Sequence, residues 1–217
     1  PATTANRWEK VKRVCAEHDG LYPAYGLHPM FVEQHQVVHL RELDEWLDRE
    51  KPIAVGECGI DFFRSRVDEK WQRQLFLEQL QLANTYHLPL IVHVRKAMDE
   101  VISLLRKHAR YGGVVHSFAG SQQQALQLHD LGFKLGIAAT VGFERARKLR
   151  AVVAAMPDDA LLLESDAPDQ PGAAHRGELN QPGYILEHLQ IMADLRQSTP
   201  AALAVTLNRN ASQLFNI

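Results

Sequence analysis

The stretch Ile53-Ala54-Val55-Gly56-Glu57 is a short apolar run that ends in a carboxylate, and three later runs repeat its pattern. These are Leu90-Ile91-Val92 before His93, Gly113-Val114-Val115 before His116, and Leu161-Leu162-Leu163-Glu164-Ser165 before Asp166. Parallel strands interleaved with helices direct their carboxyl ends to one face, so residues far apart in sequence converge there. The four runs predict an α/β fold whose four terminal polar residues form a metal-dependent active site.

Amphipathic stripes separate these runs along almost the whole chain. Apolar residues at helical spacing predict helices around residues 8–15, 40–47, 76–83, 98–105, 125–128, 149–156, 185–192 and 203–214. Strands are predicted at residues 21–27 and 133–137 and near residues 53, 90, 113 and 160. Continuous apolar strands between amphipathic helices indicate a parallel sheet that is covered on both faces or closed into a barrel.

Six predicted strands leave two architectures open. One is a complete, open α/β sheet. The other is a TIM-type (β/α)₈ barrel without its first two strands, which the loop-like opening at residues 1–6 and the missing initiating Met favour. We expect a single domain over residues 1–217, incomplete at its N-terminus, because a chain of this length and 46% hydrophobic content buries one sizeable core.

Composition narrows the class of protein. A net charge of −2 excludes a surface that coats nucleic acid through bulk positive charge, although a local basic rim could still hold phosphates. The two cysteines, Cys15 and Cys58, have no spacing typical of disulfide frameworks or zinc knuckles. No apolar stretch approaches the roughly 18 residues of a membrane span, and no signal-peptide pattern opens the chain. We expect a cytoplasmic protein with no membrane contact and no obligate protein partner.

Histidine and carboxylate ligands together suit Zn²⁺, Mn²⁺ or a related divalent ion, and a shared carboxylate can bridge two ions. A single histidine at a strand end is more often structural, but four such residues at four strand ends favour a site. The remaining histidines considered lie in helical or loop contexts, where a solvated surface role is expected: His18, His35, His39, His87, His108, His129 and His188.

Five motifs in order resemble those of the TatD family of metal-dependent hydrolases. They are Gly26-Leu27-His28-Pro29, Gly56-Glu57-Cys58-Gly59-Ile60-Asp61, His93-Val94-Arg95, His116-Ser117-Phe118-Ala119-Gly120 and Glu164-Ser165-Asp166-Ala167-Pro168. The resemblance spans the whole chain. It implies a TIM-type barrel of the amidohydrolase kind, one or two divalent ions (Mg²⁺, Mn²⁺ or Zn²⁺) and deoxyribonuclease activity on a DNA substrate.

The resemblance also implies roles for individual residues. Glu57 is similar to the carboxylate that bridges two metals, and Asp166 to the ligand that also takes the proton of the attacking water. His93 and His116 are similar to ligands of one ion. A carboxylate beside an acidified water can accept its proton while the metals stabilise charge on the phosphate. Three further residues are candidate phosphate contacts: His28, Arg95 and Arg176.

The chain departs from the family pattern in three places. The His-x-His pair that ends the family's first strand is absent from residues 1–217, in agreement with two missing strands. The family's Asn-Glu-Pro appears as Asn180-Gln181-Pro182, which removes a negative charge. Ser117 stands where many relatives carry Cys, a change expected to affect packing more than chemistry.

Other candidates are better explained by structure. Four cations at Arg145, Arg147, Lys148 and Arg150 cannot all face one ligand from a helix, so a solvated helix face is expected. Trp46 and Trp71 lie on predicted helices and are expected to pack rather than stack a base. The sequence thus favours hydrolysis of phosphodiesters, with DNA as the expected substrate. Hydrolysis of a carboxylic ester or amide and an inactive fragment stay open as alternatives.

Overall fold

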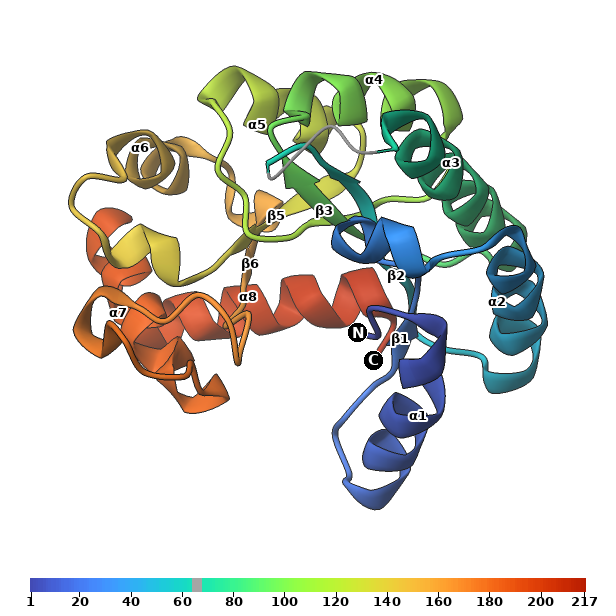
Figure 1. The fold of residues 1–217 in the computed structure, drawn as a ribbon. Helices are drawn as coiled ribbons and strands as arrows, with labels where there is room; N and C mark the ends of the chain where they lie inside the picture. Colours follow the sequence, from blue (N-terminus) through green and yellow to red (C-terminus); the bar gives the residue numbers. More distant parts are fainter. Residues whose placement is uncertain (64–67) are drawn as a thin grey trace. The chain divides into compact units, whose positions relative to one another are not determined.

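A computed structural model describes residues 1–63 and 68–217. By contacts between residues, the chain divides into two compact units, Pro1–Gly113 and Val114–Ile217. Helices and strands alternate within each unit, as the colours of Figure 1 show along the chain. The expectation of a single domain stays a prediction, and each unit is described by itself.

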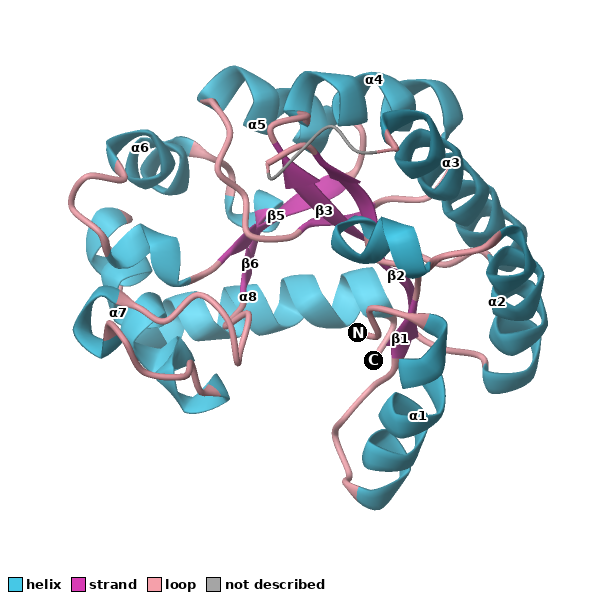
Figure 2. Ribbon diagram, in the orientation of Figure 1, coloured by secondary structure: helices cyan, strands magenta, loops and turns pink. Residues whose placement is uncertain are grey.

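The first unit contains three parallel strands in the order β1 (Ala24–Tyr25), β2 (Ala54–Asp61) and β3 (Leu90–Arg95). Its α-helices are α1 (Trp8–Glu17), α2 (Val37–Glu50), α3 (Glu69–Tyr86) and α4 (Met98–His108), with 3₁₀ turns η1 (Ala5–Arg7) and η2 (Pro29–Gln34). Helix α3 packs against β2 and also contacts α2 and α4. The succession α2, α3, α4 can be followed in Figure 2, with helices in cyan and strands in magenta.

Burial explains the packing of this unit. Every residue of β2 is buried, so both faces of the strand are covered by other parts of the protein. Helix α3 supplies Leu75, Phe76, Leu80 and Ala83 to the core, at the 3.6-residue spacing that places them on one face. The buried Gln79 of the same helix is satisfied by the backbone, since it accepts from Leu27 N and donates to Leu27 O. These two hydrogen bonds fix Leu27, the residue before His28, against α3.

The second unit contains the strands β5 (Phe133–Ile137) and β6 (Leu161–Leu163), which pair in parallel. It also contains all but the first residue of β4 (Gly113–Val115), which lies next to β5. Its α-helices are α5 (Gln122–Asp130), α6 (Arg147–Ala155), α7 (Ile185–Leu195) and α8 (Pro200–Phe215). Short 3₁₀ turns connect them: η3 (Ala139–Gly142), η4 (Asp158–Ala160), η5 (Ala173–His175) and η6 (Pro182–Tyr184). Helix α5 packs on β5 and α8 on β6, while α7 packs against α8.

Local sequence signals set the ends of these helices. Ser121 and Gln124 form a reciprocal capping box at the start of α5. At α8, Thr199 accepts a hydrogen bond from Ala202 N, and Pro200 occupies the first turn, where its missing N–H costs nothing. Helix α6 ends just before Pro157, as expected.

The predicted helices are all present, but three strands differ from expectation. β1 covers only two residues of the predicted 21–27 run. β2 continues past Gly56 to Asp61, so Glu57 lies inside the strand, and His93 likewise lies inside β3. Trp46 contacts Trp8 and Tyr25, which confirms its packing role, and Trp71 donates to His35 O. Among the described residues, no helix is long and apolar enough to cross a membrane.

Candidate metal centre

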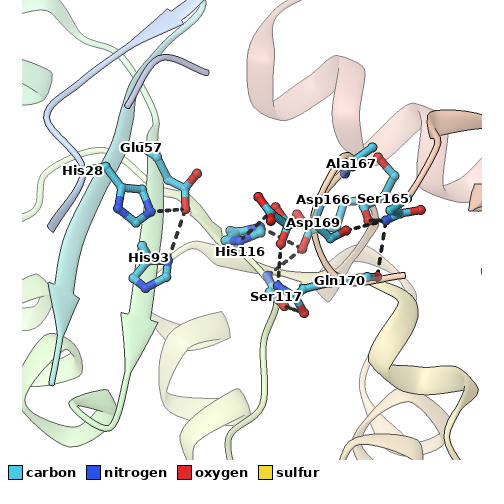
Figure 3. A network of polar contacts seen from close by, with 12 residues as sticks. His28, Glu57, His93, His116, Ser117, Ser165, Asp166, Ala167, Asp169 and Gln170 are labelled. Carbon is cyan, nitrogen blue, oxygen red and sulfur yellow. Dashed lines mark hydrogen bonds and ion pairs between the residues drawn. The ribbon is translucent and has the colours of Figure 1, made fainter. Parts of the chain in front are cut away.

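In the first unit, two histidines converge on one carboxylate. His28 Nε2 lies 3.0 Å and His93 Nδ1 lies 3.2 Å from the same atom, Glu57 Oε1. Figure 3 shows both rings directed at Glu57 from their separate segments. The three side chains offer donor atoms within 4.8 Å of one another, and Glu57 is only 8% exposed. The structure thus brings Glu57 together with His93, as predicted, and adds His28 to the pair.

The two histidines are not equivalent as ligands. His28 Nδ1 accepts a hydrogen bond from Met30 N at 3.0 Å, where it caps η2. A neutral imidazole that accepts at Nδ1 carries its proton on Nε2, so His28 donates to Glu57. His28 is therefore better suited to donate to an oxygen than to coordinate a cation. This supports its predicted role as a phosphate contact.

His35 contacts the backbone of His28, since its Nε2 lies 2.9 Å from His28 O. His35 and His188 were expected on the surface, and that expectation is wrong, because they are only 6% and 1% exposed. Burial lowers the pKa of both rings, which favours their neutral forms. His35 directly follows η2 rather than lying in an α-helix, and His188 precedes the buried Met192 by four residues, so it lies on the buried face of α7.

His93 is held between two carboxylates. Its Nε2 lies 2.8 Å from Asp61 Oδ2, opposite the Glu57 contact at Nδ1. Burial disfavours the charged ring, but the hydrogen bonds to Asp61 and Glu57 outweigh it and raise the pKa of His93. Burial likewise opposes the charge on Asp61, yet the hydrogen bond to His93 lowers the pKa of that carboxyl.

The second unit holds a similar arrangement around His116, which follows β4. His116 Nδ1 lies 3.0 Å from Glu164 Oε1, and His116 Nε2 lies 3.6 Å from Asp166 Oδ1. Glu164 also accepts the backbone N–H of Ser117. The structure therefore places the predicted pair His116 and Asp166 together. Glu164 contacts the other ring nitrogen of His116, Nδ1.

Asp166 is presented by a tightly turned loop after β6. Its φ is 58°, in the left-handed region that Asp tolerates better than most residues. The loop is organised by Asn180, which is 3% exposed and whose Nδ2 donates to Ser165 O at 2.6 Å and Asp169 O at 2.7 Å. Figure 3 shows Gln170 donating to Asp166 within this loop. The Asn180-Gln181-Pro182 variant thus keeps the residue that shapes the loop, while Gln181 is exposed.

Sequence reasoning assigned no role to Asp61 or Glu164, although both stood in quoted motifs. A usable signal existed for Asp61, which lies two strand periods after Glu57 within β2. None existed for Glu164, because β6 ends at Leu163 and Glu164 and Asp166 lie in the loop after it. Ser117 has more than a packing role, because its Oγ donates to Gln170 at 2.9 Å.

Two predicted phosphate contacts, Arg95 and Arg176, are exposed and lie beside aromatic rings. The Arg95 guanidinium carbon is 3.3 Å from the centre of the Phe63 ring, and Lys96 Nζ is 5.2 Å from it. Arg176 and Arg145 lie 5.3 and 5.2 Å from the Phe143 ring.

The four cations at Arg145, Arg147, Lys148 and Arg150 do not share one helix face. Helix α6 begins at Arg147, so Arg145 precedes it, in the segment that carries Phe143. Arg150 donates to Val141 O at 2.9 Å. The expectation of a solvated helix face therefore holds for Arg147 and Lys148, which are exposed on α6. Arg145 is exposed but precedes the helix, and Arg150 is partly covered.

The donor chemistry fits a divalent cation. Carboxylate oxygens and imidazole nitrogens are the ligands that Zn²⁺ and Mn²⁺ accept, and they are grouped within bonding reach in the first unit. Glu57 and His93 would hold the ion there, and His116 and Asp166 supply the same donor types in the second unit. Such a donor set on a parallel α/β scaffold defines the class of metal-dependent hydrolases.

Comparison with known proteins places the chain within that class. It belongs to the TatD family, since the family model described as TatD related DNase matches residues 1–216. The metal-dependent hydrolase YjjV of Escherichia coli K12 is 39% identical, with 100% of this chain and 85% of the relative covered. The hydrolase YabD of Bacillus subtilis strain 168 is 32% identical over 96% of this chain and 82% of the relative.

Solved structures agree with this assignment. The crystal structure of YjjV, a TatD homologue from Escherichia coli K12, has a TM-score of 0.96 over 100% of this chain and 85% of that one. A TatD-family hydrolase from Entamoeba histolytica, only 21% identical, shares the fold with a TM-score of 0.84 over 99% of this chain and 82% of that one. The predicted fold class, the TIM-type α/β fold of these hydrolases, is confirmed.

Proposed function

We propose that this metal-dependent hydrolase cleaves phosphodiester bonds in DNA. The family model carries the description TatD related DNase, and the donor set supplies the chemistry of a metal-assisted hydrolase. We retain a cytoplasmic setting in this proposal, because Cys15 and Cys58 are both free thiols.

The observation that carries the proposal is the pairing of aromatic rings with cations. Phe63 has Arg95 and Lys96 beside it, and Phe143 has Arg145 and Arg176. Nucleic acid presents alternating flat bases and phosphates, so an aromatic face beside two cations matches one nucleotide. A small carboxylic ester or amide has no such repeat. These two clusters favour a polynucleotide over a small neutral ester.

The residues divide the work in the proposed reaction. A divalent ion, when bound, would supply Lewis acidity toward the phosphate and acidify the attacking water. Asp166 would accept the proton of that water, and Glu57 with His93 would hold the cation. The Nε2–H of His28 donates to Glu57 in this structure, and once Glu57 holds a cation it would be available to donate to a phosphate oxygen.

The test is hydrolysis of single-stranded and nicked DNA, with carboxylic esters and amides as a parallel panel. Exhaustive chelation should abolish DNA cleavage, and Mg²⁺ or Mn²⁺ should restore it. Arg95→Gln and Arg176→Gln should raise KM for DNA and each reduce the slope of log affinity against log salt by about one. Two exposed arginines on helices serve as matched controls, Arg41→Gln and Arg209→Gln, and should leave both quantities unchanged.

DNA cleavage that survives exhaustive chelation would reject the proposal. Turnover of esters or amides without turnover of DNA would reject it as well, and would favour the alternative hydrolase activity.

A further inference from the structure

We propose that Asp61 and Glu164 are positioning residues that fix the tautomers of the two ligand histidines. Each carboxylate lies at the ring nitrogen opposite the predicted ligand carboxylate. The inference rests on the metal site of the proposed function, and it assigns that site two further residues.

Asp61 is built into the first unit as an acceptor for His93. It is 7% exposed, and its Oδ1 already accepts Phe63 N at 2.8 Å. Gln72 clamps its backbone, accepting from Asp61 N at 2.9 Å and donating to Asp61 O at 3.1 Å. An ionised carboxylate only accepts hydrogen bonds, so the Oδ2 contact at 2.8 Å requires the proton of His93 to lie on Nε2. In this structure Glu57 accepts from Nδ1 at 3.2 Å as well. A cation held by Glu57 would replace that second proton, because a ligating imidazole must be neutral, and Nδ1 would then be the ligand atom.

Glu164 has the same role toward His116 in the second unit, but it contacts Nδ1 of the ring, whereas Asp61 contacts Nε2 of His93. Its Oε1 accepts Ser117 N and lies 3.0 Å from His116 Nδ1. The carboxylate packs against the bare Cα of Gly136, where an added Cβ would lie 2.7 Å from Glu164 Oε2. The proton of His116 is thus held on Nδ1, and Nε2 is the atom that faces Asp166.

A carboxylate behind a ligating imidazole orients the ring, fixes its tautomer and makes the ligand nitrogen more basic. Loss of such a partner typically weakens metal binding about 10–100-fold. Asp61→Asn and Glu164→Gln keep shape but present an amide that can turn its NH₂ toward the ring. The histidine proton would then move to the wrong nitrogen.

The experiment uses the full chain with Zn²⁺ alone as the probe. ¹⁵N NMR of the zinc-loaded parent should show His93 protonated on Nε2 and His116 protonated on Nδ1. Competition with a chelating dye should give zinc affinities roughly 10–100-fold weaker in Asp61→Asn and Glu164→Gln. Glu50→Gln and Asp194→Asn are matched controls from the same units, and should keep the parental affinity and tautomers.

Because the parent itself reports the tautomers, the inference stays testable even when a variant fails to fold. The opposite tautomers in the zinc-loaded parent, or folded variants with parental affinity, would overturn it. A parent that binds zinc with these tautomers but does not cleave DNA supports this inference and rejects the nuclease activity. A parent that binds no zinc overturns this inference, while the nuclease proposal is decided separately by DNA cleavage with Mg²⁺ or Mn²⁺.

Discussion

At the scale of single residues, Asp166 and Glu57 should respond differently to the loss of one charge. Asp166→Asn keeps size and one ligand oxygen but cannot accept a proton, so turnover should fall roughly 10²-fold or more with metal content largely preserved. Glu57→Gln should instead reduce metal stoichiometry, because Glu57 supplies the charged oxygen that would hold the cation together with His93. Metal analysis beside turnover separates the two effects. Full metal and near-parental rates in both variants would refute the ligand assignment.

His175 provides a pH-dependent contact in the loop that carries Arg176. Its Nε2 lies 2.8 Å from Glu187 and its Nδ1 lies 3.3 Å from Glu178, while the ring stacks on Tyr184 at 3.6 Å. Hydrogen bonding to Glu187, supported by Glu178, raises the pKa of His175 above its ordinary value. The protonated ring therefore stabilises the folded state. This contribution is fully present below the pKa of histidine in the unfolded chain, about 6.5, and is lost as the pH rises through the pKa of His175 in the folded state.

His175→Gln should therefore lower Tm near about pH 5.5–6. The difference in Tm from the parent should shrink toward about pH 9, over the range in which a histidine with a raised pKa loses its proton. Thermal unfolding across this range measures it. His18→Gln, at an exposed histidine, is the control and should keep the parental Tm. A pH-independent difference for His175→Gln would contradict the ion-pair explanation.

At the scale of elements, β2 and β3 approach each other too closely for a side chain at Gly59. Gly59 is in register with His93, and an added Cβ would lie 2.0 Å from His93 O, with φ at 142°. Gly59→Ala should push β3 away and destabilise the protein by about 3 kcal/mol or more, through overpacking and backbone strain. Denaturant unfolding measures the change. Gly183→Ala, which meets nothing within 4 Å, should change stability far less. Equal stability of the two variants would contradict this account.

The elements also show where pattern reading reaches its limit. Helices α4, α6 and α8 follow the apolar spacing of the sequence, because burial of one face is a local, periodic property. The end of β2 could not be placed in the same way. Glycine and polar residues from Gly56 to Asp61 resemble a turn, yet the strand continues because β3 pairs with it through a shift in register between Val55 and Cys58.

At the scale of the whole molecule, a bound divalent ion should stabilise the folded state. An ion at about 100 times its Kd adds roughly 2.7 kcal/mol, which corresponds to a rise of about 5–10 °C in Tm for a protein of this size. Thermal unfolding with and without Mn²⁺ measures the shift, and a chelator should reverse it. Glu57→Gln should lose most of the rise, whereas Glu50→Gln should keep it. An equal rise in Glu57→Gln would show that the ion binds elsewhere.

The sequence by itself determined the order of helices and strands, the family and the four predicted ligands, because each is written in local periodicity or in contiguous motifs. Only the tertiary structure decided which atoms meet. His93 meets Asp61 across 32 residues of chain, and Ser117 meets Glu164 across 47. The burial of His35 and His188 depends in the same way on the packing of other segments around them. Such contacts arise from strand register and loop geometry, which no pattern within one segment encodes.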